Sequence, residues 1–182
     1  MLRLVTLAAV ACSLLASGCG GGEGTVTVYF EKPGSAAAPL QVVPLVAPTT
    51  RRIPDGTPLV PAVLAALEQG PSSDEIRDGF LPTAPLDRRV LAVERRDNTA
   101  VVDLSGRPLD DFDAHAALVF TLTSLPGIDR VVLLSHGKPC CVHDMQGGVV
   151  SPLTRDLYRG WAGEPCDART YADAVRCRPA GT

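Results

Sequence analysis

The shortages in this 182-residue sequence already exclude several classes of protein. Aromatic residues make up only 4% of the chain, so its core has to be built from Val, Leu, Ile and Ala. Lysine occurs only at Lys32 and Lys138, and Asp and Glu outnumber Lys and Arg by 20 to 17. The resulting net charge of −3 argues against nucleic acid as a partner and against a polybasic membrane-binding patch.

The sequence also lacks the motifs of common enzymes. It has no Gly-x-Ser-x-Gly elbow, no phosphate-binding Gly-rich loop after a strand and no His-Glu-x-x-His. His115 is expected at or near the surface of a helix. His136 follows Ser135 on a strand, where neighbouring side chains point to opposite faces and cannot act together. We therefore predict no catalytic residue and no cofactor.

The acidic residues have structural explanations as well. Asp110, Asp111 and Asp113 lie where a helix is predicted to begin, and the helix dipole favours carboxylates there. Asp103 has apolar neighbours on a predicted strand, as expected of a half-buried structural carboxylate. The alternative is an extracytoplasmic hydrolase of an unfamiliar type, in which Asp103 or the 110–113 cluster works with a histidine.

The first apolar run is too short to cross a membrane, which takes about 20 residues. Residues 1–18 combine the positive charge of Arg3 with this run, which is the layout of a secretory signal. Small residues then lead into Cys19, a pattern that resembles the lipobox of bacterial lipoproteins. The resemblance implies that residues 1–18 are removed as a signal peptide and that Cys19 carries a diacylglycerol and acyl (palmitate) anchor. An ordinary signal that leaves Cys19 as a free thiol is the alternative.

Four further cysteines, Cys140, Cys141, Cys166 and Cys177, lie in the last third of the chain. Outside the cytoplasm an even number of thiols predicts disulfides. A bond between the adjacent Cys140 and Cys141 is disfavoured by strain, so each is expected to pair with Cys166 or Cys177, in either order. Zinc is the alternative because His143 follows two thiols, but the spacing fits no standard knuckle, and we predict no metal.

The apolar pattern predicts elements in the order β-β-α-β-β-α-β. Two helices are expected, one that ends at Gly70 and one over residues 113–125. The predicted strands lie at 25–30, 40–54, 89–95, 100–104 and 129–135. This order indicates an α+β domain in which both helices pack on one face of a mixed or antiparallel sheet.

The ends of the chain are predicted to differ from this domain. Residues 19–24 are glycine-rich and are expected to form a flexible tether. Residues 140–182 have too little periodic apolar content for a core of their own and are predicted to be a loop-rich, disulfide-tied tail. Tyr158 and Trp161 are expected to form a small core in that tail, with an exposed binding platform as the alternative.

Several of these stretches together resemble the GerMN domain of sporulation and spore-germination lipoproteins, which also occurs in actinobacterial cell-envelope lipoproteins. The matching stretches are TVTVYF at 25–30, VLAALEQGPSSDEIRDGFLPTAP at 63–85, AVVDLS at 100–105 and ALVFTLTSLPGIDRVVLLSHGKP at 117–139. The resemblance covers residues 25–139 and implies an α+β binding or scaffolding domain outside the cell, without enzymatic activity.

The expected function is that of a lipoprotein on the extracytoplasmic face of the cell membrane. Its partners would be the membrane, through the anchor at Cys19, and an envelope protein or peptidoglycan component. The process would concern the envelope, sporulation or germination. Besides the hydrolase, a metal- or redox-responsive lipoprotein that uses its four C-terminal cysteines is the alternative.

Overall fold

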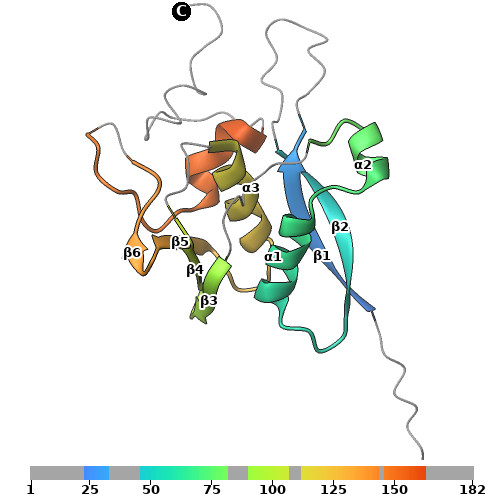
Figure 1. Ribbon diagram of the computed structural model, residues 1–182, viewed down its shortest axis with the longest axis horizontal. Helices are drawn as coiled ribbons and strands as arrows, with labels where there is room; N and C mark the ends of the chain where they lie inside the picture. Colours follow the sequence, from blue (N-terminus) through green and yellow to red (C-terminus); the bar gives the residue numbers. More distant parts are fainter. Residues whose placement is uncertain (1–22, 33–45, 82–89, 107–111, 144–145, 163–182) are drawn as a thin grey trace, which may run out of the picture.

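The computed structural model of the protein describes residues 23–32, 46–81, 90–106, 112–143 and 146–162, which form two sheets and the helices that pack on them (Figure 1). The α+β class is confirmed, and the predicted order of elements recurs with α2, β6 and η1 added. In chain order the elements are β1 (Glu23–Glu31), β2 (Val46–Pro54), α1 (Leu59–Gln69), α2 (Ser73–Arg77), β3 (Val90–Arg96), β4 (Thr99–Leu104), α3 (Phe112–Leu122), β5 (Arg130–Ser135), β6 (Lys138–Pro139) and the 3-10 helix η1 (Arg155–Ala162).

β1 and β2 form a two-stranded antiparallel sheet whose inner face packs on α1. Val26, Val28 and Phe30 alternate along β1 and are buried, as their spacing predicts. In β2, Arg51 pairs with Val26 and Thr49 pairs with Val28. Side chains of directly paired residues in antiparallel strands share a face, so Arg51 and Thr49 point to the same side of the sheet as the buried residues of β1. β1 already begins within the stretch predicted to be a tether, because its first residues pair with the end of β2.

β3, β4, β5 and β6 form the second sheet, in that order. β3 and β4 make the predicted hairpin, and Asp97 in its turn has a φ of 52°, a left-handed conformation that aspartate tolerates. β4 and β5 are parallel and are joined through α3, since parallel neighbours require a crossover connection. Helices α1 and α3 lie on the same side of this sheet (Figure 1).

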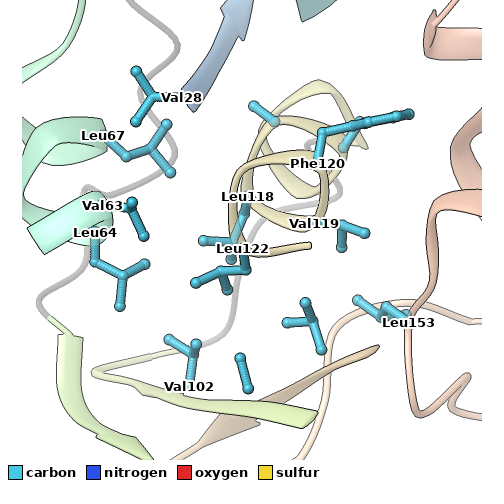
Figure 2. Close-up of a cluster of buried hydrophobic side chains, with 14 of the residues drawn as sticks. Val28, Val63, Leu64, Leu67, Val102, Leu118, Val119, Phe120, Leu122 and Leu153 are labelled. Atoms are coloured by element: carbon cyan, nitrogen blue, oxygen red, sulfur yellow. The ribbon is translucent and has the colours of Figure 1, made fainter. Parts of the chain in front are cut away.

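α3 lies in the middle of the molecule, between the two sheets. Figure 2 shows Leu118 and Leu122 of α3 between the α1 side chains and Val102 of β4. A helix that is apolar on nearly every side belongs in a core. Its buried residues are Ala114, His115, Ala116, Ala117, Leu118, Val119, Phe120, Thr121 and Leu122. His115 is only 4% exposed, so its expected place at or near the surface is wrong. Within the described part of the chain, no helix is both long and apolar enough to cross a membrane.

The strands form two sheets, where one was expected, because α3 covers the free edge of β1. The backbone N–H of Tyr29 donates a hydrogen bond to Thr121 Oγ1 at 2.9 Å. Ser124 Oγ donates to the backbone carbonyl of Thr27 at 3.0 Å. Such N–H and C=O groups at a strand edge otherwise pair with another strand. Hydroxyl groups at the end of α3 therefore terminate the first sheet.

Arg51 and Glu75 hold α2 against the first sheet. Arg51 Nη1 and Nη2 lie 2.6 and 2.7 Å from the two carboxylate oxygens of Glu75, a bidentate pair. The hydroxyl of Thr49 and the backbone N–H of Ser72 donate to the same carboxylate. These donors, Arg51 above all, lower the pKa of Glu75 from 4.5 to about 2. With side chains only 20% and 14% exposed, the pair is shielded from solvent far more than ordinary surface pairs.

The described residues after 139 pack on the same core as the strands and helices before them. The backbone N–H groups of Val131 and Leu153 each donate to the other residue's carbonyl, at 2.9 and 2.7 Å. Arg155 donates from Nη2 to the carbonyl of Phe120 at 3.1 Å and from Nε to Thr123 Oγ1 at 2.8 Å. Arg155 thereby satisfies the carboxyl-terminal end of α3, where carbonyls lack intrahelical partners.

We predict that Thr121→Val lowers the free energy of unfolding by about 1–3 kcal/mol. Valine keeps the shape of threonine but leaves the N–H of Tyr29 without an acceptor. Urea denaturation measures the change, with Thr50→Val as the control because Thr50 is exposed on β2 and should change stability by less than about 0.5 kcal/mol. Equal losses in both variants would contradict the role of Thr121 at the sheet edge.

Glu75→Gln is expected to lower the free energy of unfolding by about 1–3 kcal/mol near neutral pH. Because folding lowers the pKa of Glu75 from 4.5 to about 2, its contribution is complete above about pH 4.5 and is lost as the pH falls toward 2. Unfolding curves of wild type and variant should therefore converge in acid.

The matched control for Glu75→Gln is Asp74→Asn. Asp74 pairs with Arg77 on the same short helix, but these side chains are 80% and 75% exposed, so the change should cost less than about 0.5 kcal/mol. A stability gap between wild type and Glu75→Gln that is undiminished in acid would refute the electrostatic account of α2 docking.

Candidate functional site

The four-stranded sheet has one face in the core, and no helix of the described residues covers its other face. Ala100 and Val102 of β4, with Val131 and Leu133 of β5, point inward and belong to the core cluster. Side chains alternate along a strand, so the residues between them point the other way. Val101 points to the opposite face and lies outside the core cluster, yet it is only 8% exposed.

We call this opposite side the outer face. It is defined by Glu94 and Arg96 of β3, Val101 of β4, and Arg130, Val132 and Leu134 of β5. The register places Glu94 and Val132 on either side of Val101. Neighbouring strands lie about 4.8 Å apart, so the valine side chains touch across the sheet. Val132 and Leu134 are half-buried, and the three charged side chains are exposed.

The charged side chains of the outer face differ in whether they form ion pairs or hydrogen bonds within the chain. Arg96 Nη2 lies 2.7 Å from Glu94 Oε2, and this contact lowers the pKa of Glu94 and raises the pKa of Arg96. Asp103, on the same side of β4 as Val101, accepts hydrogen bonds from the backbone N–H of Gly137 at 3.1 and 3.0 Å. Arg130 forms no ion pair with another described residue.

Chemically, the outer face offers contact and charge recognition. Its centre is a group of three aliphatic side chains, and its rim carries exposed charges. Protein interfaces have this composition, an apolar centre with a polar rim in which arginine is enriched. In Figure 1, α1, α3 and η1 all lie on the other side of the sheet from it. The outer face is thus the candidate site for binding a partner.

The structure brings together only some of the residues considered for hydrolysis. Asp103 contacts the turn that contains His136, but it does so through the backbone of Gly137. Asp113 accepts a hydrogen bond from Trp161 Nε1 and so helps to hold η1 on α3. Asp110 and Asp111 lie outside the described residues. Asp103 is half-buried and structural, as the sequence predicts.

Tyr158 and Trp161 are both only 1% exposed, which excludes them as a surface binding platform. Their rings lie 5.5 Å apart in an edge-to-face arrangement, a favourable geometry for aromatic pairs. They belong to the main core cluster and not to a separate small core, because η1 packs on α3. The alternative that these two residues form an exposed binding platform is therefore wrong.

Cys140 and Cys141 are bonded to each other, in contrast to the expected pairing with Cys166 and Cys177. Their Cα atoms lie 3.7 Å apart because the residues are adjacent, and Cys141 is buried in the core with a φ of 99°. Cys166, Cys177 and the lipidation candidate Cys19 lie outside the described residues. Among the residues that are described, no three His, Cys, Asp or Glu side chains are grouped in a way that could hold a metal ion.

The sequence of this α+β chain matches a known family. The family model Germane, described as sporulation and spore germination, matches residues 27–141, and the chain therefore belongs to this family of GerMN domains. None of the curated proteins matches it in sequence.

Two solved structures have the same fold. One holds the tandem GerMN domains of the sporulation protein GerM from Bacillus subtilis, with 20% identity and a TM-score of 0.56 over 73% of this chain and 46% of that one. The other is the first GerMN domain of the same protein, with 24% identity and a TM-score of 0.51 over 72% of this chain and 98% of that one. The chain thus spans about half of the tandem structure and nearly all of a single domain.

The sequence pattern alone does not reveal the outer face. The stretch RVVLLS is apolar almost throughout, which is typical of a strand that is buried on both sides. Only the positions of α1 and α3 show that no described helix covers the other side. The one sequence signal is Arg130 at the start of this strand, two residues before Val132 and therefore on the same face.

Trp161 is the only tryptophan in the chain, so its fluorescence reports directly on η1. We expect acrylamide to quench it poorly in the native protein. Leu153→Ala should raise the quenching rate severalfold, since Leu153 is 1% exposed and anchors the segment before η1. Val149→Ala is the control in the same segment, because Val149 is 45% exposed. Native quenching as fast as in urea would contradict the burial of Trp161.

Proposed function

We propose that this protein is a lipid-anchored, non-catalytic binding module on the outer side of the cell membrane. Its GerMN domain docks an envelope protein or a cell-wall component in a sporulation, germination or other envelope process. The observation that carries the proposal is the outer face, an aliphatic patch with a charged rim on a sheet whose described helices α1 and α3 lie on the other side. Membership in a sporulation and spore-germination family agrees with it.

The anchor is supported by the amino-terminal sequence. Small residues precede Cys19 after a short apolar run, as in a lipobox. β1 begins at Glu23, four residues later, and an extended chain of that length reaches at most about 14 Å. An anchored chain would therefore hold its domain close to the membrane surface, where a partner in the same membrane is met without a search through solution.

A binding role is also supported by the hydrogen bonds through which polar side chains hold η1 on α3 and hold the turn after β5. Asp113, buried Trp161 and Arg155 join η1 to α3, and Asp103 holds the turn after β5. These side chains act as structural ligands of the backbone or of each other. An active site instead needs a nucleophile or base within hydrogen-bonding reach of its orienting group and an open place for substrate.

Labelling with radioactive palmitate tests the anchor. We expect the wild-type protein to take up label and to sediment with membranes, and Cys19→Ala to lose both properties because the acceptor thiol is gone. Cys12→Ala is the matched control, since Cys12 lies in the predicted signal peptide and should leave labelling unchanged. Undiminished labelling of Cys19→Ala would overturn the anchoring site, and an unlabelled wild type would overturn lipid attachment itself.

A further inference from the structure

We propose that the outer face binds a protein partner that presents an aliphatic patch beside a carboxylate, with Arg130 as the residue that pairs with that carboxylate. This inference rests on the proposed function, in that the protein is taken to be a binding module. It goes further by assigning the surface, the residues and the chemistry of the partner.

The register of β4 and β5 places aliphatic side chains next to one another on the outer face. Val101 lies beside Val132, and Leu134 follows two residues further along β5 on the same side. Pro139 of β6 lies opposite Leu134 and is exposed, which extends the patch by one more strand. Val101 itself is buried, so the aliphatic contact area comes from half-buried Val132 and Leu134 and from exposed Pro139. Burying it against a partner contributes about 25 cal/mol for each Å² removed from water.

The charge that a partner would meet on the outer face is that of Arg130. It lies two residues before Val132, so about 7 Å separates their Cα atoms on one face. The other charged groups of the outer face are engaged within the chain, Glu94 with Arg96 and Asp103 with the N–H of Gly137. Arg130 is exposed and has no ion pair with another described residue. Its guanidinium is therefore available for a bidentate contact with a carboxylate of a partner.

The shape and composition of the face favour a protein over a saccharide. Stacking on sugar rings or bases needs exposed aromatic side chains. Among the aromatic side chains whose burial the structure describes, Phe30, Phe80, Phe120, Tyr158 and Trp161 are buried and Tyr29 is half-buried. The patch itself is aliphatic, and its apolar centre beside an arginine agrees with the composition of a protein interface.

The test is site-specific photo-crosslinking of the full-length, membrane-anchored protein in the cells that make it. A photoreactive residue is placed at Val132 and, as a control, at Thr25, which is exposed on β1 of the other sheet. We expect a protein adduct from position 132 and none from position 25. Arg130→Glu should reduce that adduct at least tenfold, while Trp161 fluorescence stays native because Arg130 is exposed.

Arg77→Glu is the matched charge control. It changes the net charge by the same amount on an exposed helix of the other sheet and should leave the adduct unchanged. Mass spectrometry of the adduct then locates the partner carboxylate closest to the crosslink. Replacing that carboxylate with lysine should restore binding to Arg130→Glu, which a general loss of stability in either protein would not do.

Four results would overturn the assignment. An adduct of position 132 with a second copy of this chain, or with another segment of the same chain, would give the face a different occupant. An adduct that survives Arg130→Glu would remove the carboxylate contact. Adducts from position 25 but not from position 132 would refute this face while leaving the proposed function intact, whereas no protein adduct from either position would refute the protein-binding function itself.

Discussion

The structure depends on α3, which is buried between two sheets and completes the edge of one of them. Thr121 and Ser124 hydrogen-bond the free edge of β1, so the first sheet ends there. The aliphatic residues of α3 meanwhile fill the space between α1 and β4. Without the two hydroxyls, backbone groups of β1 would be unpaired, and without the aliphatic side chains a cavity would remain in the centre of the molecule. Both sheets are thus held in place by one eleven-residue helix.

This arrangement has a direct consequence for function. α1 and α3 pack on one side of the four-stranded sheet and η1 packs on α3, so none of these helices covers the other side within the described residues. η1 contributes to this asymmetry, since Arg155 and Trp161 attach it to α3 and away from the outer face. The same packing that stabilises the core therefore leaves Arg130 exposed, beside half-buried Val132, on the side of the sheet away from these helices.

Local sequence patterns predicted most of the strands and helices, but not which other segments of the chain pack against them. Alternation along β1, the helical spacing of α1 and the tight turn at Asp97 all follow from short-range sequence. The predicted single sheet was wrong because the hydroxyls that end β1 lie 92 and 97 residues away in the chain. The burial of His115 and Trp161 also depends on contacts between distant segments, as does the open side of β5. Such contacts leave no periodic signal in either partner segment.

The sequence by itself determined the α+β class and the order of strands and helices, because hydrophobic periodicity and turn residues act over a few neighbouring positions. Membership in the GerMN family also follows from the sequence, through the match of residues 27–141 to the family. Only the tertiary structure decided that the strands divide into two sheets around α3, that the described residues beyond 139 share the core, and that Val132 and Arg130 lie on the same outward side of β5. Those outcomes are set by which side of each strand the helices cover, and a strand's own residues do not specify that.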